Sequence, residues 1–291
     1  MNSESDKTVL SKDGTRIAYN VLGNGPAVVL VPGALGHKDA DRVRQFVTEL
    51  AKDFRVFSYD RRGRGGSGDT APYSVDKEIE DLAAICREAG GRPMVVGFSS
   101  GAALSLEAAA KGVSMRRLVA YEAPYMVGEH RRPEHARFEG ELAALLDRGD
   151  RDGALKFFMR TAGVPWYMLP IMRLMPSWKE HRKLAHTLRY DAAVLGTFEL
   201  PAARFQTIRV PTLVAAGGKT QPRLKATARA IAALIPAAQL VEVPGQKHSV
   251  EVDAFAPVLR RFAGAETVPG PTFERSGQRT SPGNPQGVSP T

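Results

Sequence analysis

The chain has 291 residues, of which 43% are hydrophobic, 40 are Lys or Arg, 31 are Asp or Glu, and one is cysteine. This composition is ordinary for a folded protein with a full hydrophobic core, and a single cysteine excludes an internal disulfide. The first residues show neither the basic nor the apolar region of a secretory signal, and glycines and prolines break the longest uncharged run, 17–37, so we expect a cytoplasmic protein without a membrane-spanning helix.

The net charge of +9 is unevenly distributed along the chain. Residues 201–264 carry 9 basic and 3 acidic side chains, whereas the remaining residues are close to balance. Nucleic-acid-binding proteins usually combine a basic stripe with a recognisable motif or with interleaved aromatic side chains, and this segment shows no such pattern. We therefore expect a small-molecule substrate as the partner, rather than a nucleic acid or a membrane. The sequence leaves the oligomeric state open.

Short β-branched runs alternate with helical patterns along most of the chain. The first is a hairpin that turns at Asp13 and Gly14 and returns as a strand over 15–22. Amphipathic patterns predict helices between the later runs, at 75–89, 102–111, 223–235 and 252–262. This alternation is typical of an α/β fold with a mostly parallel sheet. The later runs are apolar throughout, as expected of strands covered on both faces, and they are 27–31, 55–59, 94–98, 118–121, 212–215 and 239–243.

Residues 126–200 interrupt the alternation, because they contain helical patterns but no clear strand. We expect a helical subdomain here, inserted between the core segments 1–125 and 201–264. It holds both tryptophans and five of the eight methionines, which either fill its own core or line an apolar ligand pocket against the main domain. The helical patterns lie at 138–147, 152–162 and 179–195.

Residues 265–291 differ from the rest of the chain in composition. Of these 27 residues, 16 are Pro, Gly, Ser or Thr, and they show no periodicity. Such a segment cannot bury enough apolar surface to offset the entropy lost on folding. A disordered tail is therefore expected.

The segment from Gly97 to Gly101, Gly-Phe-Ser-Ser-Gly, lies between a predicted strand and a predicted helix. A serine at such a turn occupies strained backbone, and the flanking glycines let strand and helix approach closely. The start of the helix also supplies backbone N–H groups for a developing negative charge. This context favours Ser99 as a nucleophile over a plain structural turn.

Several loops make the chain resemble the α/β-hydrolase superfamily over residues 8–264. Besides the serine turn, 31–36 (Val-Pro-Gly-Ala-Leu-Gly) resembles the family's oxyanion loop, and 59–67 resembles its D-x-R-G-x-G-x-S loop. The resemblance implies an α/β-hydrolase fold with 126–200 as a helical cap. It also implies an oxyanion hole built from the backbone N–H groups of Ala34 and Ser100.

A serine hydroxyl needs a base, and His248 is the candidate because it follows the last predicted strand, where the resembling family places its catalytic histidine. The alternative interpretation is a histidine in a surface loop. Among the other histidines, His37 falls in the oxyanion loop and is a candidate for substrate contact.

The base in turn needs a carboxylate, which the resembling family most often supplies after its seventh strand. The corresponding residues here, 217–222, contain no acid. A second placement known in the superfamily follows the sixth strand, and here that position is Glu122. A charged residue at the end of an apolar strand needs a partner, so we interpret Glu122 as the triad acid. The alternatives are Asp191, a Ser-His diad, or a structural Glu122 paired with an arginine of 61–64.

The predicted function is that of a serine hydrolase that cleaves an ester-like bond through an acyl-enzyme, without metal or other cofactor. The same triad would also serve lyase, C–C hydrolase, lactonase or perhydrolase chemistry, and a ligand-binding protein with slow or vestigial catalysis is the alternative outside enzymes. The residues expected to contact substrate are Leu35, His37, Met126, Trp166 and Met172.

Overall fold

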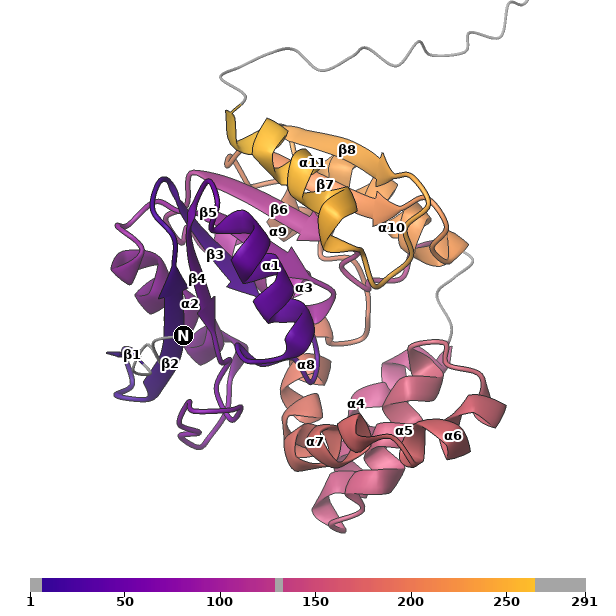
Figure 1. Ribbon diagram of the computed structural model, residues 1–291. Coiled ribbons are helices and arrows are strands. Elements are labelled where there is room, and N and C mark those ends of the chain that lie inside the picture. Colours follow the sequence, from indigo (N-terminus) through magenta and orange to yellow (C-terminus); the bar gives the residue numbers. More distant parts are fainter. Residues whose placement is uncertain (1–6, 129–132, 265–291) are drawn as a thin grey trace, which may run out of the picture.

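The computed structural model describes residues 7–128 and 133–264. These residues form one eight-stranded sheet with the strand order β1-β2-β4-β3-β5-β6-β7-β8 (Figure 1). Strands β1 and β2 form an antiparallel hairpin, and β2 pairs with β4 antiparallel, whereas every later pairing is parallel. The strands are β1 (Lys7–Leu10), β2 (Arg16–Leu22), β3 (Ala27–Val31), β4 (Arg55–Tyr59), β5 (Met94–Phe98), β6 (Arg117–Tyr121), β7 (Thr212–Gly217) and β8 (Ala238–Val243).

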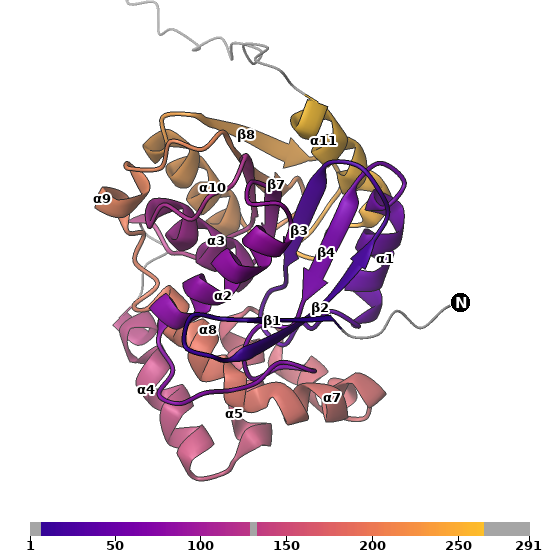
Figure 2. The same ribbon diagram turned by 90° about the vertical axis from the view of Figure 1, so that its left-hand side faces the viewer.

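Helices cover both faces of the sheet, and each face has its own hydrophobic core. Phe46 and Leu50 of α1 pack with Phe255 and Leu259 of α11 on one face. Figure 2 shows α2, α3 and α10 on the opposite side, where the larger core lies. The central strands are therefore buried on both faces, which explains their continuous apolar sequences. The helices of the sheet domain are α1 (Asp41–Leu50), α2 (Val75–Glu88), α3 (Ser100–Ala110), α9 (Ala202–Phe205), α10 (Pro222–Leu234) and α11 (Val252–Gly264).

A group of helices lies between β6 and β7 in the sequence and is called the helical insertion below. It forms a separate lobe beside the sheet domain in both views (Figures 1 and 2), and α8 joins the two parts because it packs against both α3 and α4. The elements of the insertion are α4 (Pro133–Asp147), α5 (Arg151–Thr161), η2 (Trp166–Met168), α6 (Leu169–Arg173), α7 (Pro176–Leu184), η3 (Ala185–Thr187) and α8 (Leu188–Leu195).

The predicted α/β class with a mostly parallel sheet flanked by helices is confirmed. One detail of the insertion differs, because the helix expected over 179–195 is divided into α7, the 3-10 turn η3 and α8. The tail expected at 265–291 lies outside the described residues. None of the helices in the described ranges combines the length and the apolar character needed to cross a membrane.

The turn between β5 and α3 depends on a very close approach between backbone segments. A Cβ atom on Gly97 would lie 2.5 Å from the carbonyl oxygen of Gly101 and 2.7 Å from Cα of Ala102. A Cβ atom on Gly101 would lie 2.4 Å from the carbonyl oxygen of Val31. These distances are too short for any side chain, so the two glycines allow α3 to begin directly against β3 and β5.

We expect Gly97→Ala to lower the free energy of unfolding by about 1–3 kcal/mol, the usual cost of forcing an extra methyl group into a packed core. Gly140→Ala is the matched control, because Gly140 is an exposed position in α4 with nothing within 4 Å of an added Cβ atom. Alanine there should stabilise the helix by up to about 1 kcal/mol. Urea unfolding curves of both variants measure the difference, and equal effects would contradict the prediction.

Candidate active site

Ser99 lies at the apex of the turn between β5 and α3. Its backbone has φ 53° and ψ −122°, a conformation that is rare for a residue with a side chain. Its N–H donates to the carbonyl oxygen of Tyr121 at 2.9 Å, which ties the apex to the end of β6. Strained backbone of this kind persists where the surroundings hold it in place, and it lifts the serine side chain above the sheet.

Glu122 follows the last residue of β6 and is 1% exposed. Its carboxylate accepts hydrogen bonds from the Gly217 N–H at 2.7 Å and the Thr220 hydroxyl at 3.1 Å. The third contact is with His248, whose Nδ1 lies 2.6 Å from Glu122 Oε2. The charge is thus satisfied by the last residue of β7, by the loop after β7 and by the histidine, whereas the arginines of 61–64 bind other carboxylates.

The loop that carries His248 is held at several points. The Tyr121 hydroxyl donates to the carbonyl oxygen of Lys247 at 2.6 Å, and the Lys219 N–H donates to that of Gln246 at 2.7 Å. The imidazole is 48% exposed and reaches the cavity above Ser99. With its Nδ1 proton directed at Glu122, Nε2 is left as the acceptor that a general base requires.

Ser99 and His248 line the same two cavities, but no hydrogen bond joins these two side chains. Such catalytic hydrogen bonds are often long in proteins without substrate and tighten when substrate binds. Ala34 lines both cavities as well, so the two spaces meet at the candidate nucleophile. One lies against the helical insertion and the other against α1, with empty volumes of about 660 and 860 Å³ including their mouths.

Two backbone N–H groups next to Ser99 are available to a ligand. They belong to Ala34, in the loop after β3, and to Ser100, the first residue of α3. Neither donates a hydrogen bond to another residue in the described part of the chain. Because the Ser100 N–H lies at a helix N-terminus, the helix dipole also favours negative charge at this point.

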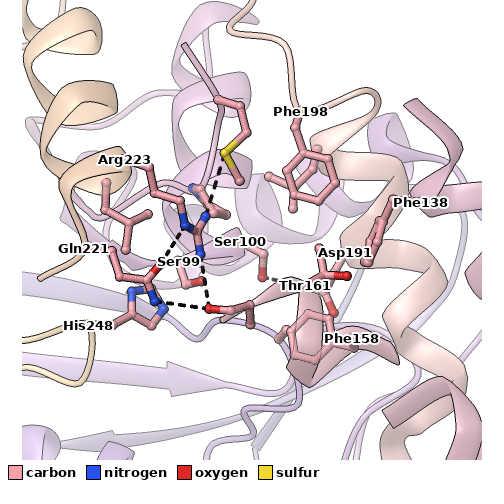
Figure 3. A pocket seen from close by; sticks show the side chains of 16 residues that line it. Ser99, Ser100, Phe138, Phe158, Thr161, Asp191, Phe198, Gln221, Arg223 and His248 are labelled. Carbon is pink, nitrogen blue, oxygen red and sulfur yellow. Dashed lines mark hydrogen bonds between the residues drawn. The ribbon is translucent and has the colours of Figure 1, made fainter. Parts of the chain in front are cut away.

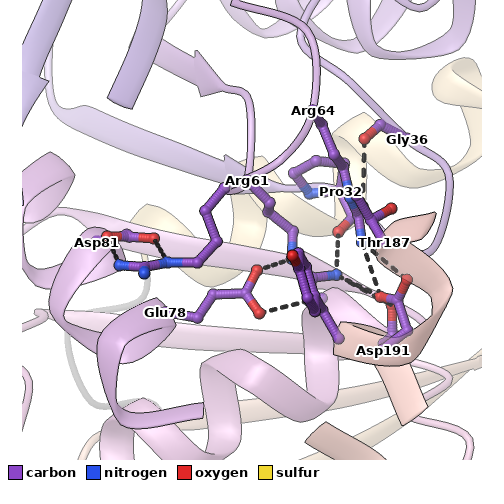
Figure 4. A network of polar contacts seen from close by, with 12 residues as sticks. Pro32, Gly36, Arg61, Arg64, Glu78, Asp81, Thr187 and Asp191 are labelled. Carbon is purple, nitrogen blue, oxygen red and sulfur yellow. Dashed lines mark hydrogen bonds and ion pairs between the residues drawn. The ribbon is translucent and has the colours of Figure 1, made fainter. Parts of the chain in front are cut away.

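Two arginines of the loop after β4 converge on Asp191 of α8 (Figure 4). Arg61 Nη1 lies 2.7 Å from Asp191 Oδ1, and Arg64 Nη2 lies 2.9 and 2.8 Å from the two carboxylate oxygens. All three side chains are at most 2% exposed. Burial raises the pKa of Asp191, but Arg64, Arg61 and a hydrogen bond from Ser100 outweigh it and hold that pKa below its ordinary value.

The same cluster supports the loops around Ser99. The Ser100 hydroxyl donates to Asp191 Oδ1 at 2.7 Å, and Arg64 Nη1 donates to the carbonyl oxygens of Gly33 at 2.7 Å and Gly36 at 3.3 Å. The cluster therefore joins α8 of the insertion to the two segments that carry the free N–H groups. Asp191 was an alternative for the triad acid, but among the described residues its hydrogen bonds go to this cluster and none reaches His248.

The cavity against the insertion has two different sides (Figure 3). Ser99, His248, Gln221 and Arg223 lie together on one side, and aromatic side chains of the insertion and the adjoining segment lie on the other. The aromatic residues are Phe138, Phe158 and Phe198. The sequence pointed to the helices that carry the first two, but the orientation of a short amphipathic helix is set by packing against other segments.

Of the five expected substrate contacts, Met126 lines this cavity and the other four do not. Leu35 is 5% exposed and packs in the main core, and Met172 is partly buried against that core. Trp166 is 74% exposed in η2, whereas Trp178 is buried in the interior of the insertion. His37 lies near His181 of α7, where its charge adds to burial in lowering the pKa of that imidazole.

The described residues contain no group of three or more His, Cys, Asp or Glu side chains arranged to hold a metal ion. Cys86 is 2% exposed within α2, and burial raises the pKa of its thiol to about 12. It takes part in the main hydrophobic core.

Comparison with known proteins agrees with the fold described above. Residues 28–261 match the alpha/beta hydrolase family. A solved alpha/beta hydrolase from Sphaerobacter thermophilus shares 46% sequence identity with a TM-score of 0.83, covering 88% of this chain and 100% of that one.

Curated relatives match over shorter stretches. The uncharacterized hydrolase YraK of Bacillus subtilis is 34% identical over 102 residues, or 34% of this chain, and the proline iminopeptidase PfmaB of Pestalotiopsis fici is 26% identical over 141 residues, or 47% of this chain. These matches span 37% and 48% of the two relatives' own lengths.

We expect Asp191→Asn to lower the free energy of unfolding by about 3–5 kcal/mol at neutral pH, because it leaves the buried Arg64 without its carboxylate and removes one of the two carboxylates that pair with Arg61. The folded pKa of Asp191 lies below the unfolded value, so its contribution is complete above pH ~4 and is lost as the pH falls through the folded pKa. The stability difference between wild type and variant should therefore shrink in acid.

Asp147→Asn is the control, since Asp147 forms an exposed ion pair with Arg189 at 3.0 Å and should cost less than about 1 kcal/mol. Denaturant unfolding at several pH values provides the measurement. A cost for Asp191→Asn as small as that of the control at neutral pH would contradict the prediction.

Proposed function

We propose that this chain, which belongs to the alpha/beta hydrolase family, is a serine hydrolase that cleaves ester-like bonds of a small molecule. Its membership in the family confirms the resemblance predicted from the sequence. Ser99 is the nucleophile, His248 the base and Glu122 the acid. The observation that carries the proposal is the 2.6 Å contact between His248 Nδ1 and the buried Glu122 carboxylate, at the mouth of the cavity that Ser99 lines.

The first half of the reaction forms an acyl-enzyme. Ser99 Oγ attacks the carbonyl carbon of the substrate while His248 Nε2 removes the hydroxyl proton. The imidazolium that results is stabilised by Glu122, which keeps its negative charge throughout. His248 then gives the proton to the leaving alcohol as the tetrahedral intermediate collapses.

Negative charge on the carbonyl oxygen is stabilised by the N–H groups of Ala34 and Ser100. Both are without another acceptor in the described chain, so they need not break an internal hydrogen bond to bind the oxyanion. The Arg61–Arg64–Asp191 cluster holds the segments that carry them, which limits the reorganisation needed in the transition state.

The second half regenerates the enzyme. A water molecule loses a proton to His248 Nε2 and attacks the acyl carbon, and the returning proton releases Ser99 and a carboxylic acid. The two cavities that meet at Ser99 provide separate space for the acyl and alcohol portions of the substrate. Apolar and aromatic side chains in the cavity against the insertion favour a substrate with an apolar portion.

A fluorophosphonate probe should label the wild-type protein and fail to label Ser99→Ala, because the probe reacts only with an activated serine. Ser177→Ala, which alters an exposed serine in α7, is the control and should be labelled like wild type. Labelling is read by gel fluorescence and intact mass. Equal labelling of Ser99→Ala, or no labelling of wild type, would remove the support for a serine nucleophile and leave a binding function.

Replacing Glu122 by Gln should lower kcat by about 10³- to 10⁴-fold, because an amide can hold the imidazole in the wrong tautomer and cannot stabilise the imidazolium. Glu242→Gln removes a surface carboxylate that pairs with Lys225 and Arg229, and it should leave kcat close to wild type. Hydrolysis of 4-nitrophenyl esters and thermal melting are measured together. A folded Glu122→Gln protein with normal kcat would refute the assignment of the acid.

A further inference from the structure

Arg223 is a half-buried cation on the wall of the cavity against the insertion. It stands in the first turn of α10, and it lines the cavity together with Ser99 and His248. In the described part of the chain, no carboxylate lies within 4.0 Å of its guanidinium group. A charge that has left water in this way normally has an anionic partner.

The three hydrogen bonds of Arg223 all go to neutral groups. Its Nε donates to Gln221 Oε1 at 2.7 Å, its Nη2 to the carbonyl oxygen of Ala162 at 3.1 Å, and its Nη1 to the sulfur of Met126 at 3.8 Å. These contacts come from three separate segments and hold the guanidinium plane in one orientation. A guanidinium has five N–H donors, so one N–H on each terminal nitrogen is left without an acceptor in the described chain.

The carboxylates nearest to this cavity are already engaged. Asp191 is paired with Arg61 and Arg64, and Glu122 accepts from His248, Gly217 and Thr220. Burial lowers the pKa of Arg223, and the charge of Glu122 offsets this only in part. Desolvation is therefore not fully compensated inside the protein, although a guanidinium remains charged at neutral pH.

The position of Arg223 relative to the candidate nucleophile defines a substrate shape. Figure 3 shows Arg223 on the same side of the cavity as Ser99 and His248, with Phe138 and Phe158 on the opposite side. A carbonyl above Ser99 can thus have an anionic group directed to Arg223 and an apolar portion directed to the aromatic side chains.

We propose that Arg223 binds a carboxylate of the substrate, so that the substrates are esters that carry a free carboxylate together with an apolar portion. The inference rests on the proposed serine-hydrolase function. One guanidinium with two free N–H donors matches a singly charged, planar carboxylate. A phosphate would bring more charge to a wall on which Arg223 is the only cation among the described lining residues.

The location of the acid at Glu122 is what keeps Arg223 free. Residues 217–222, just before Arg223, contain no Asp or Glu. A carboxylate in that loop would stand within a few residues of the guanidinium and would be available to neutralise it. With the acid placed after β6 instead, Gly217 at the end of β7 and Thr220 in the loop after it supply hydrogen-bond donors to Glu122.

The experiment compares two esters of the same size and leaving group, 4-nitrophenyl hydrogen adipate and its neutral analogue, in which a carboxamide replaces the free carboxylate. The readout is the ratio of kcat/KM for the anionic ester to kcat/KM for the neutral one. Wild type should favour the anionic ester, and Arg223→Gln should lower the ratio roughly 10- to 100-fold, the effect of losing a hydrogen-bonded charge pair.

Arg229→Gln is the matched control, because Arg229 lies on the same helix but is exposed and pairs with Glu242 at 2.7 Å. It should keep the wild-type ratio, which excludes a general effect of removing a positive charge from α10. An unchanged ratio in Arg223→Gln, or a wild type that prefers the neutral ester, overturns the inference while leaving the serine-hydrolase proposal intact.

If wild type hydrolyses neither ester, the proposed ester hydrolysis fails and binding decides the inference. Isothermal titration calorimetry with monomethyl adipate is then performed on wild type, Arg223→Gln and Arg229→Gln. A Kd at least about 10-fold higher for Arg223→Gln alone supports carboxylate binding. Equal Kd values in all three proteins, or no detectable binding to wild type, overturn it.

Discussion

The buried carboxylate of Glu122 is the constraint around which the sheet edge is arranged. An ionised carboxylate that is 1% exposed costs several kcal/mol unless its oxygens are satisfied. Here the donors come from the end of β7, from the loop after it and from the loop after β8, so three consecutive strands must end at one place. The contacts that complete this edge of the sheet therefore also orient His248. The same contacts offset the free-energy cost of burying the Glu122 charge.

A second buried charge cluster fixes the position of the helical insertion against the sheet domain. Arg61 and Arg64 reach Asp191 across the boundary between the domains, and Ser100 completes the contact. Because these side chains are at most 2% exposed, moving α8 away would leave Arg64 and Asp191 as charges without a partner, whereas Arg61 would keep its pair with Glu78. The insertion is thereby held over the start of α3, and the cavity between them keeps a defined floor.

The features that could be predicted from the sequence are those determined by single segments. Continuous apolar runs bounded by turns indicated the parallel strands, and the ends of these strands located Ser99, Glu122 and His248, which lie around one site in the structure. Features that depend on how two segments pack could not be read in this way. Phe138 and Phe158 face the cavity and Trp166 faces solvent, although all three occur in similar apolar surroundings in the sequence, because the orientation of each short helix is set by its neighbours. For the same reason no local pattern showed that Asp191 binds two arginines from a loop more than a hundred residues away.

The uneven charge of residues 201–264 has its physical explanation in contacts between distant parts of the chain. Arg204 pairs with Glu107, and Arg260 pairs with Glu49 and Asp53, so acids of the first half neutralise bases of the second. Part of the basic excess of this segment is therefore neutralised by acids from other parts of the chain. Arg223 is different because it is turned inward, onto the wall shared with Ser99 and His248, and its hydrogen bonds within the described residues go only to neutral groups. One residue of the basic segment thus places a positive charge on the wall of the candidate active site, which is the basis for proposing an anionic group on the substrate.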